Sequence, residues 1–510
     1  MLAKVNSYGL HGILGYPVQV EVDISNGLPA FETVGLPDAA VKESKERVRA
    51  AIRNTGLDFP LQRITVNLAP ADMRKEGPIY DLPIAVGLLI ASGQLPQESV
   101  SGTLCLGELA LDGTLRPVNG VLPMLIAARK EGFARIVLQE ENTPEATFVP
   151  GVEVFPARTL RQIADHLRGD AQIPRVNQRA WEDVRDRDEA KGELARIRGQ
   201  AHAKRAAEIA AAGGHNLLLI GPPGSGKTML ARCMPSILPD ITFEEALEAT
   251  EIHSVAGALP RSGGIVSRRP FRSPHHTIST AALTGGGRNI KPGEISLAHL
   301  GVLFLDELPE FKRDALEAMR QPLEDGVVTV ARVSGSASFP ARFMLVAAMN
   351  PCPCGHMGSK LRECRCTPMQ VQRYRNRISG PLLDRIDMHV EMRAVTYDEI
   401  SSKPGGERSE AVLRRVNAAR AIQIDRYRDD GVFFNAQLDA RLVDRYCAVD
   451  EKGRDLLEQA FHRLKLSARA YARILKVART IADLEGCDAI GTGHIAEAIQ
   501  YRSLDRDAKP

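Results

Sequence analysis

A complete phosphate-binding loop in the middle of the chain constrains its fold more than any other segment. Residues 221–228 match the pattern G-x-x-x-x-G-K-[ST], whose glycines let the backbone curl so that successive N–H groups point at a triphosphate. The apolar run before the loop suits a buried parallel strand, and Thr228 begins a helix whose N-terminus faces the phosphates. Lys227 supplies charge to the β and γ oxygens, and the Thr228 hydroxyl is a Mg²⁺ ligand. The predicted contacts of the nucleotide, ATP, are Gly221, Pro222, Pro223, Gly224, Ser225, Gly226, Lys227 and Thr228.

Composition is that of a globular protein and adds few constraints. The 510 residues are enough for about three domains, and 44% apolar and 25% charged residues are ordinary values. A net charge of +3 is too small to argue for nucleic acid, so any basic surface must be local. The first residues lack the apolar stretch of a secretion signal, and the longest apolar run, residues 82–92, is too short to cross a bilayer. We therefore expect a cytoplasmic protein with no membrane partner, whose eight cysteines are thiols or metal ligands.

The patterns along the chain predict three domains and a linker. Residues 1–165 combine alternating strand patterns with helical ones and predict an α/β domain. Residues 166–192 are polar and of mixed charge, which is typical of a linker. Residues 193–395 hold the nucleotide-binding core, and residues 396–510 are mostly helical. The expected fold class is α/β, with an αβα core between the other two domains.

Two further apolar strands end in residues suited to ATP hydrolysis. One precedes Asp306 and Glu307. In P-loop ATPases the first carboxylate orients a Mg²⁺-bound water and the second polarises the attacking water. The other strand precedes Asn350, whose side chain can hold the lytic water near the γ-phosphate. Many buried strands end in acidic loops, but the ordered set is specific. We predict Glu307 and Asn350 as catalytic residues, and Asp306 with Thr228 as the magnesium site.

Two arginines complete a set that resembles the machinery of AAA+ motors. Arg385, in segment 380–387, resembles the arginine finger that reaches the γ-phosphate of a neighbouring subunit. Arg469 begins a C-terminal helix and resembles the sensor-2 arginine of the helical lid. A surface ion pair is the alternative for each. A finger that acts between subunits requires an oligomer, and the resemblance implies a homo-hexameric ring.

Two insertions in the core resemble those of the magnesium-chelatase and minichromosome-maintenance branch of AAA+ proteins. The first is a basic, proline-containing stretch over residues 265–277, and the second, residues 326–339, has the pattern of a β-hairpin. In helicases of that branch such hairpins face a central pore and grip the DNA backbone. The resemblance therefore implies phosphate contacts from Arg268, Arg269, Arg272 and Arg332. A subunit interface explains any single one of these arginines equally well. For the adjacent His275 and His276 we expect a structural or DNA-facing role rather than a metal site.

Four of the eight cysteines fall in one short segment that is rich in glycine and charge. Its two C-x-C pairs supply four thiolates, enough to close a tetrahedral structural Zn²⁺ site, and redox-active thiols are the alternative. The predicted zinc ligands are Cys352, Cys354, Cys364 and Cys366. Six basic residues against one acidic residue between positions 360 and 377 favour a nucleic-acid partner for this zinc knuckle.

The N-terminal segment resembles the proteolytic domain of Lon proteases but lacks the residues for proteolysis. The resemblance lies in residues 70–81 and 107–120. In that family a serine follows the Gly-Pro pair and a lysine lies just after the later glycine. Ile79 and Leu122 stand at these two positions here, and neither side chain is a nucleophile or a base. We expect a Lon-like domain that serves as an assembly or DNA-binding collar.

Over nearly its whole length the chain resembles the bacterial ComM/YifB family. This resemblance rests on the order of the domains and on short sequence motifs at residues 31–38, 198–200, 350–355 and 379–385. The family implies an ATP-driven hexameric DNA motor that promotes branch migration when incoming single-stranded DNA is integrated during natural transformation. The implied cofactors are ATP, Mg²⁺ and Zn²⁺, and the implied partners are single-stranded and branched DNA. A chelatase-like motor and a protein-remodelling motor share the core and remain the alternatives.

Overall fold

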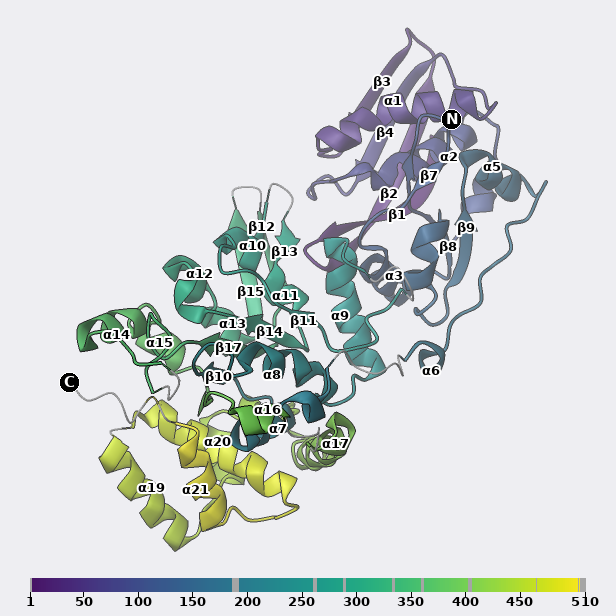
Figure 1. Cartoon of the computed structure of the whole chain (residues 1–510). Coiled ribbons are helices and arrows are strands. Elements are labelled where there is room, and N and C mark those ends of the chain that lie inside the picture. Colours follow the sequence, from purple (N-terminus) through teal and green to yellow (C-terminus); the bar gives the residue numbers. More distant parts are fainter. Residues whose placement is uncertain are drawn as a thin grey trace.

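The computed structural model describes residues 2–185, 192–259, 264–287, 290–332, 335–358, 362–401, 406–464, 466–502 and 504. An N-terminal α/β domain lies at one end of an elongated molecule, and the nucleotide-binding core and the C-terminal helices form the other end (Figure 1). The expected mixed α/β architecture is therefore confirmed.

A seven-stranded sheet with the order β3-β4-β2-β1-β5-β8-β9 is the centre of the N-terminal domain. Its strands are β1 (Leu2–His11), β2 (Leu14–Ser25), β3 (Ala30–Val34), β4 (Arg63–Ala69), β5 (Thr103–Cys105), β8 (Arg135–Gln139) and β9 (Glu153–Ala157). The helices are α1 (Ala39–Asn54), α2 (Asp81–Ala91), α3 (Val121–Lys130), α4 (Thr143–Ala146) and α5 (Leu160–Arg168), and a small hairpin joins β6 (Glu108–Leu109) to β7 (Leu115–Arg116).

Local signals in the sequence set the two ends of α1. The Asp38 side chain accepts a hydrogen bond from the Val41 backbone N–H and caps α1. Gly56, in the left-handed region at φ +72°, follows the end of that helix. The α5 helix crosses the limit that we expected at residue 165, and Ile173 packs into the core of this domain. The beginning of the expected linker is thus held to the N-terminal domain by apolar contacts.

The nucleotide-binding core is built on a five-stranded parallel sheet with the order β11-β14-β17-β10-β18. Its strands are β10 (Leu217–Ile220), β11 (Phe271–Arg272), β14 (Val302–Leu305), β17 (Met344–Met349) and β18 (Met388–Glu391). The longer helices around it are α7 (Ala201–Gly213), α8 (Lys227–Cys233), α9 (Phe243–Ala256), α12 (Arg313–Ala318), α13 (Arg320–Asp325) and α14 (Pro368–Arg375). The shorter elements are α6 (Trp181–Val184), α10 (Thr280–Thr284), β12 (Gly285–Gly286), β13 (Lys291–Pro292), α11 (Glu294–Leu297), α15 (Gly380–Leu383) and α16 (Tyr397–Ser401). The second predicted insertion is a hairpin of β15 (Val327–Arg332) and β16 (Gly335–Pro340).

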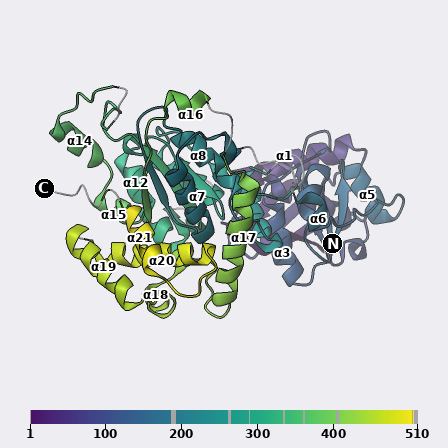
Figure 2. The same cartoon turned by 60° about the horizontal axis from the view of Figure 1, so that its bottom comes forward.

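The C-terminal helices lie on one side of this sheet, where two of them pack against α7. They are α17 (Ser409–Arg426), α18 (Ala440–Tyr446), α19 (Glu451–Leu464), α20 (Ala468–Leu484) and α21 (Thr492–Gln500), and Figure 2 shows them together on one side of the core. The two that pack against α7 are α17 and α20. Alternate strand residues face opposite sides, so that Leu217 and Leu219 join one apolar cluster with Val416 and Ile474 of the helices. The predicted helical domain therefore shares a hydrophobic core with the sheet.

The N-terminal domain touches α9 and the β15–β16 hairpin of the core. The Gly120 N–H donates to the Ser254 carbonyl of α9 at 3.1 Å, and the Ser254 hydroxyl donates to the buried Glu145 carboxylate at 2.5 Å. The β1–β2 turn meets the β15–β16 hairpin, where a His11 ring nitrogen lies 2.9 Å from the Ser336 carbonyl oxygen. Ile13 of the same turn packs against the cluster that contains the hairpin. Among the described residues, none of the helices has the length and apolar character needed to span a membrane.

Candidate nucleotide site and metal centre

The phosphate loop lies at the carboxyl edge of the parallel sheet. Gly224 and Gly226 have φ values of +78° and +90°, which favour glycine. Gly221 is required for a different reason, because a Cβ there would lie 2.5 Å from the Met392 carbonyl oxygen. The loop is tied to the sheet by a 3.2 Å hydrogen bond from the Gly221 N–H to the Met349 carbonyl. The loop geometry therefore depends on close backbone contacts from two neighbouring strands.

The predicted hydrolytic residues converge on this loop. The register of the parallel strands places Ile220 beside Met349, and Leu305 beside Ala347, so that the residues after each strand end meet at one edge. The Thr228 hydroxyl donates to an Asp306 carboxylate oxygen at 2.8 Å. This pair fits a magnesium ion, which would take the Thr228 hydroxyl as a ligand and would keep a bound water held by Asp306.

The Lys227 ammonium contacts both the phosphate loop and Asn350. Its ammonium donates to the carbonyls of Gly221 at 2.6 Å and Pro222 at 3.0 Å, and to the Asn350 side-chain oxygen at 3.3 Å. Burial lowers the pKa of Lys227, while the carboxylates of Asp306 and Glu307 act in the opposite direction. Asn350 and the loop lysine therefore lie together, as the sequence predicted.

Glu307 has an unusual backbone and an unexpected neighbour. Its φ is +52°, a left-handed conformation that costs a residue with a side chain about 1–3 kcal/mol. The His276 ring nitrogen lies 3.4 Å from its carboxylate, which is more than half exposed. Sequence reasoning gave His276 no role beside this residue. Only the strand pairing could have indicated this contact. His276 follows β11, β11 pairs with β14, and Glu307 follows the end of β14.

Gln200 is a second residue that sequence reasoning missed. Its side-chain NH₂ donates to the carbonyl of Ser225 in the phosphate loop at 3.2 Å and to the carbonyl of Arg393 at 2.6 Å. Gln200 thus connects the loop with the segment that follows β18. The phrase at residues 198–200 supported the family resemblance, but nothing in it indicated this contact.

Arg385 lies at the opposite edge of the sheet from the phosphate loop. Its carbonyl accepts from the Asn216 side chain at 3.1 Å, and Asn216 precedes β10, whereas Gly221 follows that strand. At about 3.3 Å per residue, the two ends of β10 are about 16 Å apart. The Arg385 side chain is 6% exposed; it donates to the Pro381 carbonyl at 2.6 Å and forms an ion pair with Glu324.

Arg469 lies near the same edge. It is exposed in the first turn of α20, and its charge, with those of Arg385 and Arg320, acts on Glu324. The Arg385 side-chain hydrogen bond to Glu324 is the main cause that lowers the pKa of that glutamate. Both predicted arginines therefore lie away from the phosphate loop of their own chain.

The four predicted DNA contacts differ in their surroundings. Arg269 donates to the carbonyls of Pro239 at 2.5 Å and Leu300 at 2.9 Å, and it pairs with Glu245 at 2.8 Å. Arg272 makes two 2.6 Å hydrogen bonds to Glu294. These two guanidinium groups hold the insertion to the core, which favours a structural role for them. Arg268 is partly buried, and Arg332 ends β15 with a side chain that lies outside the described part of the structure.

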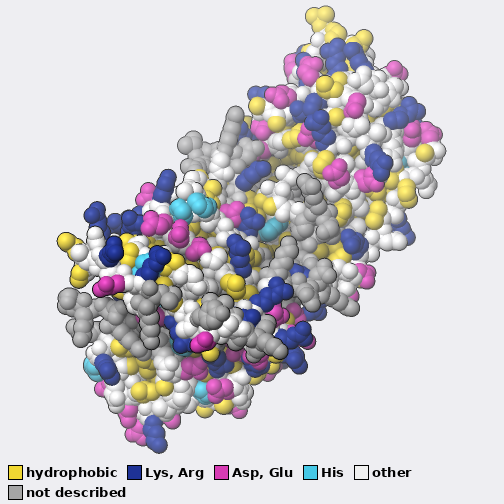
Figure 3. Space-filling view, viewed as in Figure 1, with side chains coloured by type: hydrophobic (Ala, Val, Ile, Leu, Met, Phe, Trp, Pro, Cys, Tyr) yellow, Lys and Arg dark blue, Asp and Glu magenta, His cyan; other side chains and the backbone are white. Residues whose placement is uncertain are grey.

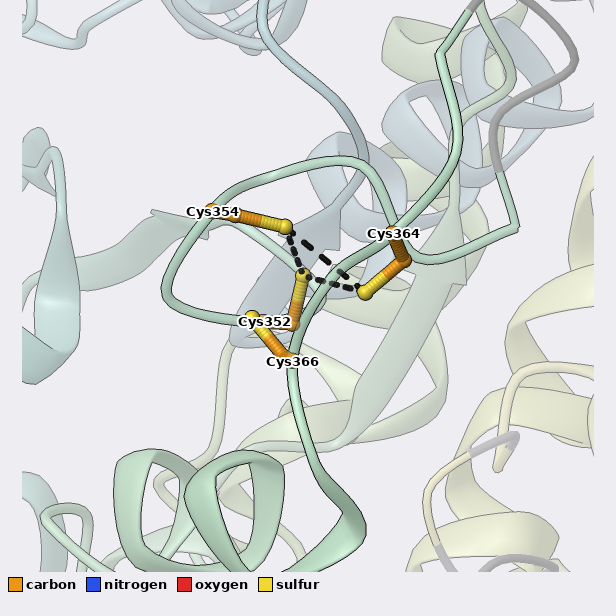
Figure 4. A group of neighbouring side chains, drawn as sticks. All are labelled: Cys352, Cys354, Cys364 and Cys366. Atoms are coloured by element: carbon orange, nitrogen blue, oxygen red, sulfur yellow. Dashed lines mark hydrogen bonds between the residues drawn. The ribbon is translucent and has the colours of Figure 1, made fainter.

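The four cysteines of the predicted zinc site converge, as Figure 4 shows. The sulfur of Cys352 lies 3.4 Å from that of Cys354 and 3.7 Å from that of Cys364, and the last two are 3.6 Å apart. The Cys366 sulfur completes a group within which all ligand atoms lie within 4.8 Å of one another. Tetrahedral zinc with bonds of 2.3 Å spaces its sulfurs by about 3.8 Å. The donor set therefore fits Zn²⁺, and the sulfur spacing is too long for disulfides. Residues 359–361 of this segment lie outside the described residues.

The positions of the protease residues are filled by buried aliphatic side chains. Ile79 is 8% exposed and Leu122 is fully buried. Ile79 also lines a cavity of about 560 Å³ that extends to Lys291 of β13 and Ala337 of β16. This part of the Lon-like domain thus borders β13 and the hairpin insertion of the core, and it has no nucleophile at the expected point.

Comparison with known proteins agrees with this geometry. Residues 193–400 match the family described as magnesium chelatase, subunit ChlI; residues 20–142 match subunit ChlI of Mg-chelatase, and residues 406–502 match the ChlI C-terminal family. The chain is 45% identical over 508 residues to competence protein ComM of Haemophilus influenzae, covering 99% of this chain and 98% of that protein. It is 45% identical over 512 residues to YifB of Escherichia coli, with the same coverage. The chain belongs to the ComM/YifB family.

The N-terminal domain shows a more distant similarity as well. Lon protease 2 of Bacillus subtilis is 24% identical over 148 residues, which cover 28% of this chain and 26% of that protein. The Lon-like character of the N-terminal domain and the magnesium-chelatase type of the AAA+ core, both expected from the sequence, are confirmed.

Proposed function

We propose that this ComM/YifB protein is an ATP-driven, homo-hexameric DNA translocase that promotes branch migration during the integration of incoming single-stranded DNA. The observation that carries the proposal is the division of the hydrolytic set between two edges of one sheet. Lys227, Asp306, Glu307 and Asn350 lie at the carboxyl edge, and Arg385 lies at the amino edge. Such a division suits a ring in which each subunit completes its neighbour's site. The name of the Haemophilus influenzae relative supports a role in competence.

The chain's own residues have clear tasks in this proposal. Backbone N–H groups of the phosphate loop and the Lys227 ammonium bind the triphosphate, and Thr228 with Asp306 holds Mg²⁺, which neutralises phosphate charge when bound. Glu307 accepts a proton from the attacking water, which Asn350 helps to place. Arg385 and Arg469 of a neighbouring subunit stabilise charge that develops on the phosphoryl group. The protein would work in the cytoplasm.

The proposed DNA contacts depend on local charge. Acidic and basic side chains are mixed over the face shown in Figure 3, in keeping with the net charge of +3. A phosphate contact must therefore come from a small cluster. We place it on the β15–β16 hairpin with Arg332, because Arg269 and Arg272 are engaged within the chain. Arg268 stays a prediction from the family resemblance. The basic surroundings of the zinc knuckle are a second candidate contact.

The deciding experiment is the ATPase rate with and without single-stranded DNA, on protein with a measured zinc content. We expect several-fold stimulation by DNA and loss of all activity in Lys227→Ala. Glu307→Gln should lower kcat about 100-fold or more because it removes the general base, while ATP binding persists. Wild-type turnover in Glu307→Gln would contradict its assignment as the base.

The same experiment tests the alternative function. The match to the magnesium-chelatase families favours a motor that acts on a partner other than DNA. The alternative would be supported by an ATPase activity that DNA does not stimulate at any of several salt concentrations. The same result would exclude the translocase. Stimulation by branched DNA beyond that of single strands would support branch migration.

A further inference from the structure

The cysteine knuckle, which we define as the described residues 351–358 and 362–366, rests on the phosphate loop. Gly355 of the knuckle is buried, with φ at +80°. A Cβ at this position would lie 2.8 Å from Cδ and 3.0 Å from Cγ of Pro223, and 3.8 Å from Cγ of Asn350. Separations below 3.0 Å are not tolerated in a packed interior. The knuckle backbone is therefore in direct contact with the loop that is predicted to bind ATP.

The knuckle also begins at the residue that contacts the loop lysine. Asn350, whose side-chain oxygen lies 3.3 Å from the Lys227 ammonium, is separated from Cys352 by one proline. Cys352 is fully buried, so the first metal ligand has a fixed position next to Asn350. A displacement of this cysteine would be transmitted along two peptide units to the Asn350 side chain.

The turn between the first two ligands depends on Cys352. Its carbonyl accepts from the Gly355 N–H at 3.0 Å, and its sulfur accepts from the Met357 N–H at 3.4 Å. Backbone N–H groups directed at a sulfur are typical of a thiolate ligand, whose charge they stabilise. The arrangement of ligands thus determines where Gly355 lies against Pro223.

We propose that the zinc-bound knuckle is a wall of the nucleotide site and that zinc occupancy sets the affinity for ATP. Binding of Zn²⁺ by the four cysteines holds Gly355 against Pro223 and holds Asn350 beside Lys227. Loss of the ion removes the bonds that tie the four sulfurs together, and the cysteines take up protons as the metal leaves. The wall is then free to move away from the loop. This inference rests on the ATP site and the zinc ligands of the proposed function, but it requires no DNA.

The inference differs from the role that basic composition suggested for the knuckle. A knuckle that only contacts DNA would leave ATP binding unchanged when DNA is absent and zinc is removed. A wall of the nucleotide site changes ATP binding under those same conditions. Equilibrium binding of a fluorescent ATP analogue without DNA therefore separates the two roles.

A pair of glycines in the knuckle provides matched variants. Gly358 has φ +75°, close to that of Gly355, but a Cβ there would meet none of the described residues within 4 Å. Both Gly355→Ala and Gly358→Ala therefore place an alanine in the left-handed region, at a similar cost. Only the methyl group of Gly355→Ala would clash with Pro223. We expect Gly355→Ala to weaken binding of the ATP analogue about tenfold with one zinc per chain retained, and Gly358→Ala to bind as the wild type does. Equal affinities in the two variants would overturn the inference.

Removal of the metal gives a second, independent test. A chelator should release zinc, detected with a chromophoric indicator, and weaken binding of the ATP analogue; added zinc should restore both. Zinc-free protein that keeps both its circular dichroism spectrum and its ATP affinity would overturn the inference. Purified protein that contains no zinc and does not bind added zinc would overturn it as well. ATP affinity that follows zinc while DNA fails to stimulate hydrolysis would sink the translocase proposal and leave this inference standing.

Discussion

At the scale of single residues, Glu307 is held in a conformation that a glutamate does not adopt unaided. Its φ of +52° requires support from the surroundings, and His276, 3.4 Å from its carboxylate, is one source of that support. Neighbouring His275 instead has a ring nitrogen 2.9 Å from the Thr277 hydroxyl. His276 is therefore expected to position the general base without touching the nucleotide.

Removal of the His276 ring should lower the rate of ATP turnover and leave ATP binding unchanged. We expect His276→Ala to lower kcat about 3–10-fold, since a loosely held base spends less time in the reactive geometry, and to leave ATP affinity unchanged. His276→Asn should restore part of the rate, and His275→Ala should behave as the wild type. Steady-state kinetics with a separate binding measurement check this. A higher basal rate in His276→Ala would show that the histidine restrains Glu307 instead.

At the scale of elements, patterns local in the sequence were sufficient for most of the nucleotide site. The apolar runs before Gly221, Asp306 and Asn350 are adjacent parallel strands, because buried strands with polar ends are recognisable from a few residues. The hairpin over residues 326–339 was also predictable, since the alternation of apolar and polar residues along its strands is a local signal.

Contacts between distant segments were not predictable in the same way. The Gly355–Pro223 contact and the approach of His276 to Glu307 join segments whose sequences show no mutual pattern. The engagement of Arg272 with Glu294 is similar, because charge alone does not distinguish an internal ion pair from a free cation. Such contacts depend on how the elements pack, which single-sequence periodicity does not specify.

The contact of α9 with α3 contains a carboxyl group that should make stability depend on pH. Burial and the neighbouring Glu248 raise the pKa of Glu251 from 4.5 to about 7, and Lys130 of α3 opposes the shift. Between these two values the folded chain binds a proton that the unfolded chain releases, so stability falls as pH rises from about 4.5 to 7. We expect a loss of about 3 kcal/mol across this window.

Glu251→Gln isolates this effect because it keeps the shape of the side chain without its charge. The variant should match the wild type in thermal unfolding near pH 5 and exceed it near pH 8. Differential scanning fluorimetry at several pH values compares the two proteins. Parallel pH profiles for both would show that the Glu251 carboxyl does not titrate in this range.

At the scale of the whole molecule, the two edges of the core sheet have different chemistry. The phosphate loop occupies one edge, and Arg385 with Arg469 occupies the other, on the side where α20 packs. The Arg385 side chain is buried, its Nε has no hydrogen-bond partner among the described residues, and its ion pair with Glu324 fixes its position. A head-to-tail ring brings the arginine edge of one subunit to the phosphate edge of the next.

Mixing two inactive variants tests this arrangement directly. Lys227→Ala disables a subunit's own site, and Arg385→Ala disables the site of its neighbour, so each protein alone should be inactive. In randomly mixed rings an intact site has an intact neighbouring arginine in about one quarter of positions, and we expect about one quarter of the wild-type ATPase rate. Lys227→Ala mixed with Glu307→Gln is the control, because both changes disable a subunit's own site and no intact site can form. Activity in neither mixture, with rings shown to exchange subunits, would show that Arg385 does not act on the site of the neighbouring subunit.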